Sequence, residues 1–483
     1  MKTTLPQALL QLQPSSDTPY YRQIYIRLRG AIADGLLKPG HRIASARALA
    51  AELGLARGTI ESAYALLTAE GYIEARGQAG TIVAPGVRPH AAAAASMPAP
   101  SFRHPMHEVE SHADSGPALV MPRPFQMGVP ALDAFPRKIW ARLAAREARA
   151  TRSSDMLYPP PAGLAPLRVE IARYLQLSRG ISCAPEQVFV TAGYRDSLDL
   201  ITRALLQPGD QVWMEDPGYP PSASLLRSAG MQLVGVPVDG QGVQVEQGVL
   251  LAPGARAAMV TPAHQSPLCV TLSLQRRIAL LDWAARQRAW IIEDDYDGEY
   301  RYDSRPLPSL KSLDRDDRVL YAGTFSKVLF PAIRLAYLVV PAAEVTRFEQ
   351  AALCFSGGSP VLMQKAVAAF MAEGHFARHI QRMRRLYAER RELAAAGLAE
   401  VLGRAVQMQT TPGGMHLLIR LKGRRSDRLL AQRMRDAGMF SRALSDCTLD
   451  GRRDLPSMLM LGFTNITSPG QAQELGRRML ALL

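Results

Sequence analysis

A lysine that follows two hydroxyl residues and precedes an arginine is the most informative chemical feature of this 483-residue sequence. Lys327 follows Thr324 and Ser326 and precedes Arg334, just after an apolar run, 319–322, that predicts a β-strand. A lysine becomes nucleophilic when burial and neighbouring cations lower its pKa. Lys327 is therefore a candidate for imine formation with an aldehyde cofactor, although a Ser-Lys pair taken alone is more often a surface feature.

Three further segments carry residue types that such a cofactor needs. An acidic cluster, 293–297, ends an apolar run, and a carboxylate there could keep a pyridine nitrogen protonated. Gly193, Tyr194 and Arg195 join a predicted strand to a predicted helix, where backbone amides and the helix dipole favour a phosphate. Tyr219 lies on a proline-containing turn, where its ring could stack on a flat heterocycle. Because the segments occur together, they predict a pyridoxal 5'-phosphate (PLP) site better than an ordinary strand end, helix start and turn.

Strand and helix patterns alternate around these segments, which favours an α/β fold with a parallel sheet between helices. The predicted strands are 188–191, 211–215, 257–261, 289–293, 319–322 and 335–340, and the predicted helices include 197–206 and 274–286. From about residue 369, a long arginine-rich helical stretch and two strands, 415–420 and 457–463, predict a small C-terminal α+β subdomain.

The N-terminal residues have a different pattern, that of a small α+β unit. The predicted elements are a helix from Tyr21 to Ala33, a helix over 46–53 with Ser45 as its cap and Gly54 at its end, a helix over 57–70 and a hairpin over 71–83. Two short helices joined by a glycine-containing turn and followed by a hairpin predict a winged helix-turn-helix, whose second helix can enter the major groove of DNA.

Composition supports a multidomain protein that meets a polyanion. We expect a DNA-binding domain over 1–84, a linker over 85–117 and a PLP-binding domain over 118–483, with its large part at about 150–368 and its small part at about 369–483. The formal charge of +14 favours DNA, while a solvated basic surface is the alternative. The four scattered cysteines predict neither a metal site nor disulfides, and with no secretion signal or membrane span a cytoplasmic location is expected.

The N-terminal pattern resembles the GntR family of transcription regulators. The matching residues are Ser45, Arg47, Arg57, Thr59, Glu70, Gly71, Tyr72, Arg76, Gly80 and Thr81. The resemblance implies that Ser45, Arg47, Arg57 and Thr59 serve DNA binding, and that Arg76 with Gly77 approaches the minor groove or the backbone. Ala46 and Ala56 stand where the family often has serine, so one helix cap should be weaker.

The remainder resembles fold-type I aminotransferases, and the combination is similar to the MocR/GabR subfamily of regulators. The resemblance implies that Lys327 forms the PLP aldimine, that Asp294 pairs with the pyridine nitrogen and that Tyr296 binds the ring hydroxyl. Asp295 stays open as the rival of Asp294, because adjacent strand residues point oppositely. By the same resemblance Tyr219 stacks on the ring, Gly193, Tyr194, Arg195, Thr324, Ser326 and Arg334 serve the phosphate, His264 and Gln265 line the pocket, and Tyr158 reaches a phosphate across a head-to-tail homodimer.

Two departures from the family bear on its ligand. Aminotransferases carry an arginine that clamps the substrate carboxylate, and Met460 stands at that position. The second carboxylate-binding arginine of the GABA-responsive members is Pro221 here. A thioether cannot replace a bidentate guanidinium. The sequence therefore favours a sensor of PLP itself, or of a small amino compound without a conventionally clamped carboxylate.

The leading hypothesis is a PLP-dependent transcription regulator that binds a double-stranded DNA operator and responds to a small-molecule effector. One alternative is a working aminotransferase with an appended DNA-binding domain, although the missing arginines argue against steady turnover. Another is a DNA-binding protein whose large domain has lost its cofactor. The sequence departs from the family pattern at two further places: Cys269 and Ala336 stand where the family usually has glycine, and Arg195-Asp196 stands where it usually has Gln-Gln.

Overall fold

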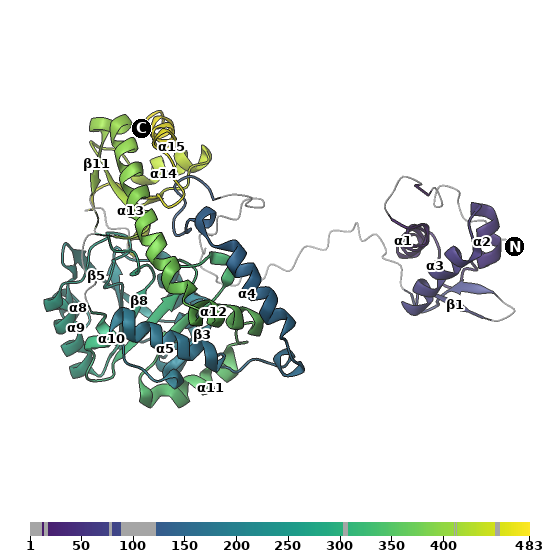
Figure 1. Ribbon diagram of the computed structural model, residues 1–483, viewed down its shortest axis with the longest axis horizontal. Helices are drawn as coiled ribbons and strands as arrows, with labels where there is room; N and C mark the ends of the chain where they lie inside the picture. Colours follow the sequence, from purple (N-terminus) through teal and green to yellow (C-terminus); the bar gives the residue numbers. More distant parts are fainter. Residues whose placement is uncertain are drawn as a thin grey trace. The chain divides into compact units, whose positions relative to one another are not determined.

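The computed structural model describes residues 12–13, 18–76, 80–87, 122–302, 308–409, 411, 413–449 and 455–483. Gly77 and most of the predicted linker lie outside these ranges. The chain divides into two compact units, Met1–Pro105 and Met106–Leu483, and each is described by itself (Figure 1). Within the described ranges, no helix combines the length and the apolar composition that crossing a bilayer requires.

The smaller unit packs three helices and a hairpin around one apolar core. Its elements are α1 (Tyr20–Ala33), α2 (Ala46–Leu53), α3 (Arg57–Ala69), β1 (Ile73–Ala75) and β2 (Thr81–Val83). The Ser45 hydroxyl caps α2 by accepting a hydrogen bond from Ala48 N at 3.2 Å, and Gly54 ends the helix with a φ of 64°. Ala56 precedes α3 without a side-chain cap. The predicted winged helix-turn-helix, including its weaker second cap, is confirmed.

An eight-stranded mixed sheet forms the centre of the larger unit. Its order is β3-β10-β9-β8-β7-β4-β5-β6. The strands are β3 (Val188–Thr191), β4 (Gln211–Asp216), β5 (Gln232–Asp239), β6 (Gly242–Val243), β7 (Ala257–Val260), β8 (Trp290–Asp295), β9 (Val319–Thr324) and β10 (Ala336–Val339). Strands β5, β4, β7, β8 and β9 pair in parallel. The prediction of a parallel sheet is wrong for β10, which is antiparallel to β3 and β9, because an apolar run does not fix strand direction.

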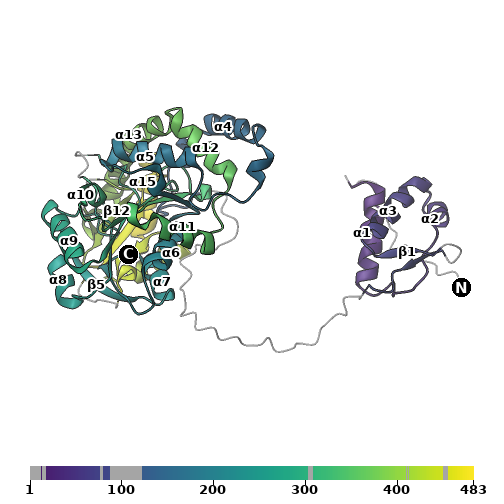
Figure 2. The same ribbon diagram turned by 90° about the horizontal axis from the view of Figure 1, so that it is seen from below.

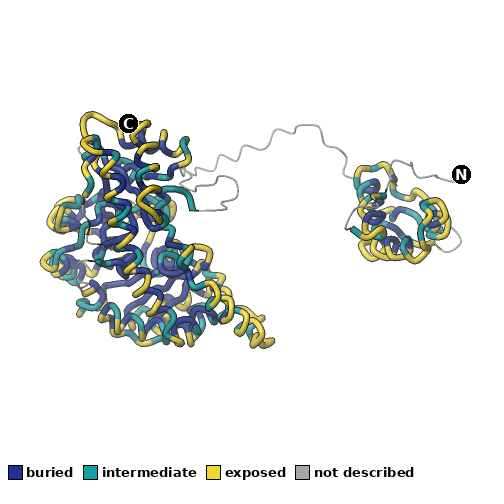
Figure 3. Tube along the Cα trace, turned by 45° about the horizontal axis from the view of Figure 1, so that its top comes forward, coloured by how far each residue is buried: buried dark blue, intermediate teal, exposed yellow. Residues whose placement is uncertain are grey.

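Helices cover both faces of this sheet. One face carries α4 (Arg137–Arg149), α5 (Ala165–Arg179), α8 (Val245–Leu251), α9 (Leu274–Gln287), α10 (Leu310–Leu313) and α12 (Val361–Ala372). The other carries α6 (Tyr194–Leu205), α7 (Pro220–Ser228) and α11 (Val345–Phe355), which lie together in Figure 2. Along β9, Val319 and Tyr321 pack on the first face, and Leu320 and Ala322 on the second. Because the two faces of the sheet pack against different helices, neighbouring residues of one strand have different surroundings. Figure 3 shows the buried interior of the larger unit with exposed residues around it.

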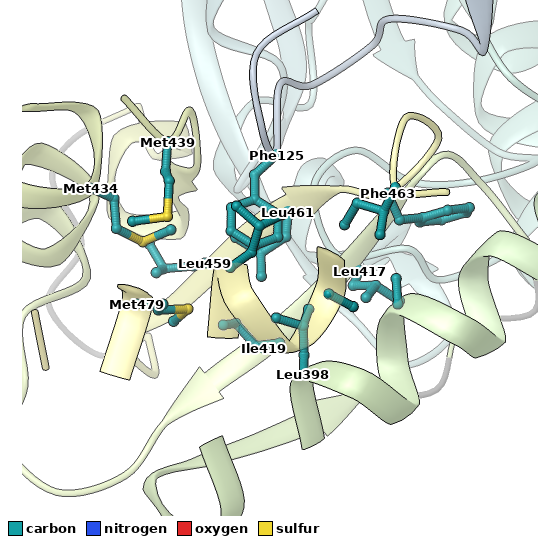
Figure 4. Packing of buried hydrophobic residues seen from close by; sticks show 14 of the residues in the cluster. Phe125, Leu398, Leu417, Ile419, Met434, Met439, Leu459, Leu461, Phe463 and Met479 are labelled. Atoms are coloured by element: carbon teal, nitrogen blue, oxygen red, sulfur yellow. The ribbon is translucent and has the colours of Figure 1, made fainter. Parts of the chain in front are cut away.

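A smaller antiparallel sheet forms the C-terminal part. Its order is β11-β12-β14-β13, with β11 (Val406–Gln409), β12 (His416–Leu421), β13 (Arg442–Ala443) and β14 (Met458–Gly462), and it packs with α13 (His375–Leu402), α14 (Asp427–Asp436) and α15 (Pro469–Leu480). The side chain of Phe125, far away in the sequence, lies beside Leu461 in this core (Figure 4). The carbonyl of Phe125 accepts a hydrogen bond from Gly462 N at 3.0 Å. The predicted α+β subdomain is confirmed, with an N-proximal segment as an unpredicted component.

Candidate functional site

A cavity of about 290 Å³ lies where β8 and β9 end and the smaller sheet begins. All of the predicted cofactor residues except Tyr158 line it: Lys327, Asp294, Tyr296, Tyr219, Gly193, Tyr194, Arg195, Thr324, Ser326 and Arg334. Asp297, from the predicted acidic cluster, also lines it. Sequence reasoning did not single out the other contributors: Met127, Gly128, Pro220, Ser266, Pro331, Met415, His416, Arg442 and Cys447. The carboxyl ends of parallel strands are where open α/β sheets bind ligands, so the topology itself brings these segments together.

Lys327 lies in the turn that follows β9, and buried neighbours fix its position. Phe325 and Val328, each 1% exposed, pack into the core on either side of the lysine. Its Nζ donates a hydrogen bond to the carbonyl of Gly128 at 2.9 Å. Burial lowers the pKa of Lys327, and Arg442 lowers it further, against the opposing charges of Asp297 and Asp294. The lysine thus meets the condition for a nucleophilic amine.

The two adjacent aspartates of β8 face opposite sides of the sheet. Asp294 lines the cavity, and burial raises its pKa to about 8 although a hydrogen bond from Tyr194 opposes the shift. Asp295 instead accepts hydrogen bonds from Arg179 Nε at 2.6 Å and from Tyr321 Oη at 2.5 Å. Although burial alone would raise it, these partners hold the pKa of Asp295 below its usual value. The carboxyl group that faces the cavity is therefore that of Asp294.

Tyr296 extends the same strand into the cavity and is supported from behind by a histidine. The Tyr296 hydroxyl lies 3.0 Å from His264 Nδ1, which also lies 3.1 Å from the carboxylate of Asp297. The expectation that His264 and Gln265 line the pocket is wrong, because both are buried behind its wall. The Gln265 amide donates to the carbonyl of Pro217 at 2.9 Å. These two side chains support the wall of the cavity through their hydrogen bonds.

One end of the cavity is suited to a phosphate group. Gly193 directly precedes α6 as its N-cap and has a φ of 114°. Residues with a Cβ atom rarely adopt this backbone conformation. A Cβ atom there would lie 3.4 Å from an Arg334 Nη atom, which places the guanidinium against the glycine backbone. Arg195, Thr324 and Ser326 line the same cavity. Cations, hydroxyl groups and the first turn of a twelve-residue helix together form an anion cradle.

Two predicted aromatic residues have contrasting positions. Tyr219 precedes α7 and lines the cavity, with its ring 6.5 Å from the ring of Tyr194 in an edge-on arrangement. Burial raises the pKa of Tyr219, so its ring is a neutral wall. Tyr158 is 98% exposed and takes no part in the cavity of its own chain. The geometry brings Tyr219 to the site and leaves Tyr158 away from it.

The two positions that lack the expected arginines also separate. Met460 lines the cavity from β14, whereas Pro221 belongs to α7 and is not part of the lining. A different arginine, Arg442 on β13, lines the cavity and pairs in register with Met460. Strand β13 has only two residues, too few for a periodic pattern, so the sequence alone offered no indication of it.

The residues predicted to meet DNA lie at the starts of α2 and α3 and on the hairpin. Arg47 is exposed in the first turn of α2, and Arg57 and Thr59 lie in the first turn of α3. Arg57 pairs with Glu61 at 2.7 Å, and Arg76 pairs with a neighbouring glutamate on the hairpin. Exposed pairs of this kind are worth well under about 1 kcal/mol, so phosphate groups can displace them.

Comparison with protein families assigns both units. Residues 20–83 match the family described as bacterial regulatory proteins, gntR family, and residues 128–458 match aminotransferase class I and II. The second match includes the whole cavity apart from Met127 and Met460.

Curated relatives share this two-part organisation over most of their length. The chain is 38% identical to the probable rhizopine catabolism regulatory protein MocR of Rhizobium meliloti, over 90% of this chain and 89% of that protein. It is 34% identical to the transcriptional regulator TauR of Rhodobacter capsulatus (86% and 87% covered). It is 33% identical to the pyridoxine biosynthesis transcriptional regulator PdxR of Corynebacterium glutamicum (85% of each).

Solved structures resemble the larger unit. A kynurenine aminotransferase of Pyrococcus horikoshii is 27% identical with a TM-score of 0.66, covering 74% of this chain and 89% of that one. The α-aminoadipate aminotransferase LysN of Thermus thermophilus is also 27% identical, with a TM-score of 0.67 and coverage of 74% and 91%. The fold around the cavity is thus an aminotransferase fold.

Proposed function

Because this chain belongs to the MocR-type regulators of the gntR family, we propose that its aminotransferase-like unit binds PLP and senses PLP or a small amino compound. The chain is a helix-turn-helix transcription regulator, as its relatives MocR, TauR and PdxR are. The observation that carries the cofactor proposal is the occurrence of Lys327, Asp294 and the anion cradle in one cavity. The cofactor would supply an aldehyde for the lysine and an electron-withdrawing ring.

Each part of the cofactor has a chemically suited partner among the described residues. Lys327 would hold the aldehyde carbon, Asp294 the pyridine nitrogen and Tyr296 the ring hydroxyl, while Tyr219 would lie against the ring. The cradle at Gly193 would hold the phosphate, with the hydroxyl and guanidinium groups already described. The related kynurenine aminotransferase contains PMP, and LysN contains a phosphopyridoxyl-leucine compound, which supports this assignment.

The smaller unit is proposed to bind its operator through the first turns of α2 and α3. Ser45 would keep the start of α2 in place, Arg47, Arg57 and Thr59 would contact bases or phosphates, and Arg76 would follow the backbone or the minor groove. Arginine suits both tasks, because its fork pairs with guanine or with phosphate oxygens. Gly77, the remaining predicted contact, lies outside the described residues.

The domain boundaries 1–84, 85–117 and 118–483 and a head-to-tail homodimer belong to the same proposal. Met156, Leu157 and Tyr158 are 78%, 70% and 98% exposed. Three consecutive exposed apolar residues favour coverage by a partner, and a partner's cofactor phosphate would give the Tyr158 hydroxyl its role. Ligand binding would then select one arrangement of the DNA-binding units over another. A cytoplasmic location accords with four free cysteines.

Borohydride reduction tests the cofactor site directly. Protein incubated with PLP and then reduced should carry a pyridoxyl mass on the peptide that contains Lys327. The variant Lys327→Ala should carry none there, whereas Lys422→Ala, at an exposed lysine outside the cavity, should resemble the wild type. A wild-type protein without the modification would refute the cofactor proposal. The proposal that the protein senses its ligand is tested by comparing operator binding of cofactor-free and PLP-loaded protein, with DNA fragments selected from genomic DNA.

A working aminotransferase is the second candidate, and one observation favours it. Lys327, Asp294 and Tyr296 all face the same cavity, so the groups that promote transamination are present. Repeated turnover with a panel of amino donors and keto acids separates the two functions. Sustained product formation far beyond one equivalent per site would favour the enzyme, and a single equivalent or less would favour the sensor.

A further inference from the structure

Arg442 occupies a position in the cavity that the family pattern does not assign. Strands β13 and β14 are antiparallel, and Arg442 lies directly opposite Met460 in their register. Side chains of directly opposed residues in antiparallel strands project from the same face. Both residues accordingly line the cavity. The guanidinium therefore enters beside the position where related aminotransferases carry their carboxylate-binding arginine.

The other cations of the cavity have different places. Lys327 donates to the carbonyl of Gly128, and Arg334 lies against Gly193 at the phosphate end. Arg195 lies in the first turn of α6 at the same end. Arg442 comes from the opposite wall, the smaller sheet. Its positive charge adds to the lowering of the Lys327 pKa by burial, and it opposes burial, which raises the pKa values of Tyr219 and Cys447. Among the described lysine and arginine residues that line the cavity, Arg442 alone comes from the smaller sheet, whereas the others lie between β9 and β10 of the larger sheet or on α6 at the phosphate end.

Arg442 is also available to an incoming anion. In the part of the chain that the structure describes, its guanidinium makes no hydrogen bond or ion pair with a side chain or carbonyl. Its neighbours along the wall, Met460 and Cys447, are buried and carry no charge that would compete. Asp294 and Asp297 are the carboxyl groups that line the cavity; Asp294 belongs to β8 of the larger sheet and Asp297 follows that strand. A cation with apolar neighbours attracts an anion more strongly than one in water does.

We propose that Arg442 binds the carboxylate of an amino acid whose amino group reaches Lys327, so that the effector is an amino acid rather than a simple amine or PLP alone. This inference rests on the proposed function, because the amino group needs the cofactor. It also revises the expectation drawn from Met460, since the opposing strand supplies a guanidinium to the same cavity. A bidentate fork matches a carboxylate in geometry and charge.

Matched amines and amino acids test the inference. Full-length protein loaded with PLP is titrated with alanine or β-alanine against ethylamine, and with 4-aminobutyrate against propylamine, at equal concentrations of unprotonated amine. Cofactor absorbance and calorimetry report binding. At least one amino acid should half-saturate at a concentration at least tenfold lower than its amine, which corresponds to about 1.4 kcal/mol. The variants Arg442→Met and Arg442→Gln should remove this preference.

Two further variants separate a carboxylate contact from a general disturbance. Arg420→Met makes the same change at an exposed position of β12, in the same sheet but outside the cavity, and should keep the preference. The double variant Arg442→Met with Met460→Arg places a guanidinium on β14 instead of β13. It should restore the preference for amino acids over amines at least in part. Melting curves and PLP loading verify that each variant is folded.

The outcomes distinguish this inference from the proposed function. Protein that takes up no PLP would overturn both. Loaded protein that responds equally to amino acids and their amines, or whose preference survives in both Arg442 variants, would overturn only the role of Arg442. Loss of the preference in Arg442→Met, with restoration in the double variant, would support it.

Discussion

Replacing Asp294 with asparagine should stabilise the cofactor-free protein while weakening its hold on PLP. Burial raises the pKa of Asp294 from 3.8 to about 8. The folded state therefore keeps the carboxyl protonated up to about pH 8, whereas the unfolded chain ionises near pH 4. Between these values the folded state binds one proton more, so the free energy of unfolding falls as pH rises. Asparagine has nothing to ionise and avoids this loss.

The expected size follows from the displaced pKa. One pKa unit corresponds to about 1.36 kcal/mol, so at pH 7 the cost that asparagine removes is about 4 kcal/mol at most. Glu215 and Glu293, whose pKa values burial raises to about 7, act in the same direction in both proteins. The pH dependence of unfolding between pH 5 and 8 should therefore become shallower by about 1.4 kcal/mol per pH unit in the variant, without disappearing.

Urea unfolding followed by tryptophan fluorescence is the appropriate assay. All four tryptophans, Trp140, Trp213, Trp283 and Trp290, belong to the larger unit, so the transition reports that unit alone. The matched control is Asp295→Asn, which removes the charge of the 2.6 Å partner of buried Arg179 and leaves that arginine the pair with Glu299 at 3.0 Å, so that the variant should be destabilised by up to about 3–5 kcal/mol. A variant Asp294→Asn that is no more stable than wild type at pH 8, or that has an unchanged pH slope, would refute the reasoning. With PLP added, its stability advantage should shrink or reverse.

Four other substitutions test helix capping, DNA contact and core packing. Ala56→Ser should supply the missing cap of α3 and stabilise the smaller unit by about 1 kcal/mol, while Ser45→Ala should cost α2 about the same, as measured by thermal melting followed by far-UV circular dichroism. Arg57→Ala should weaken operator binding, as measured by fluorescence anisotropy. If the Arg57 side chain contacts a phosphate, the variant should also reduce the slope of log affinity against log salt concentration by about 1. An unchanged affinity would exclude a DNA contact by Arg57. Phe125→Ala should destabilise the larger unit by about 3–5 kcal/mol, because this ring, 1% exposed, fills the core of the smaller sheet. A decrease in the free energy of unfolding below about 1 kcal/mol would contradict that packing.

Local patterns predicted those parts of the site that depend on adjacent residues. The cap at Ser45, the strand before Lys327 and the glycine turn at Gly193 each follow from a few neighbouring residue types. The choice between Asp294 and Asp295 did not, because alternation along a strand shows that they face oppositely but not which face meets the cavity.

Long-range pairing accounts for what the sequence left out. Arg442 joins the site only because two residues of β13 pair with β14, and Gly128 only because a segment some 200 residues earlier reaches Lys327. His264 was expected in the lining for its motif, but contacts with Tyr296 and Asp297 hold it behind the wall. Similarly, the reversed direction of β10 depends on how the chain returns to the sheet, which no local pattern encodes.

The hydrogen bond between Lys327 and Gly128 joins the lysine amine to the N-proximal segment of the larger unit. Gly128 has a φ of 69°, and a Cβ atom there would collide with the lysine amine, so the contact requires glycine. A covalent change at the Lys327 amine would alter the hydrogen-bond donor of the Gly128 carbonyl. The same short segment is held to the smaller sheet, because the carbonyl of Phe125 accepts a hydrogen bond from Gly462 N, and the carbonyl of Pro124 accepts one from Phe440 N, two residues before β13. A modification of one nitrogen atom would therefore disturb a contact made by the first residues that the structure describes in the larger unit.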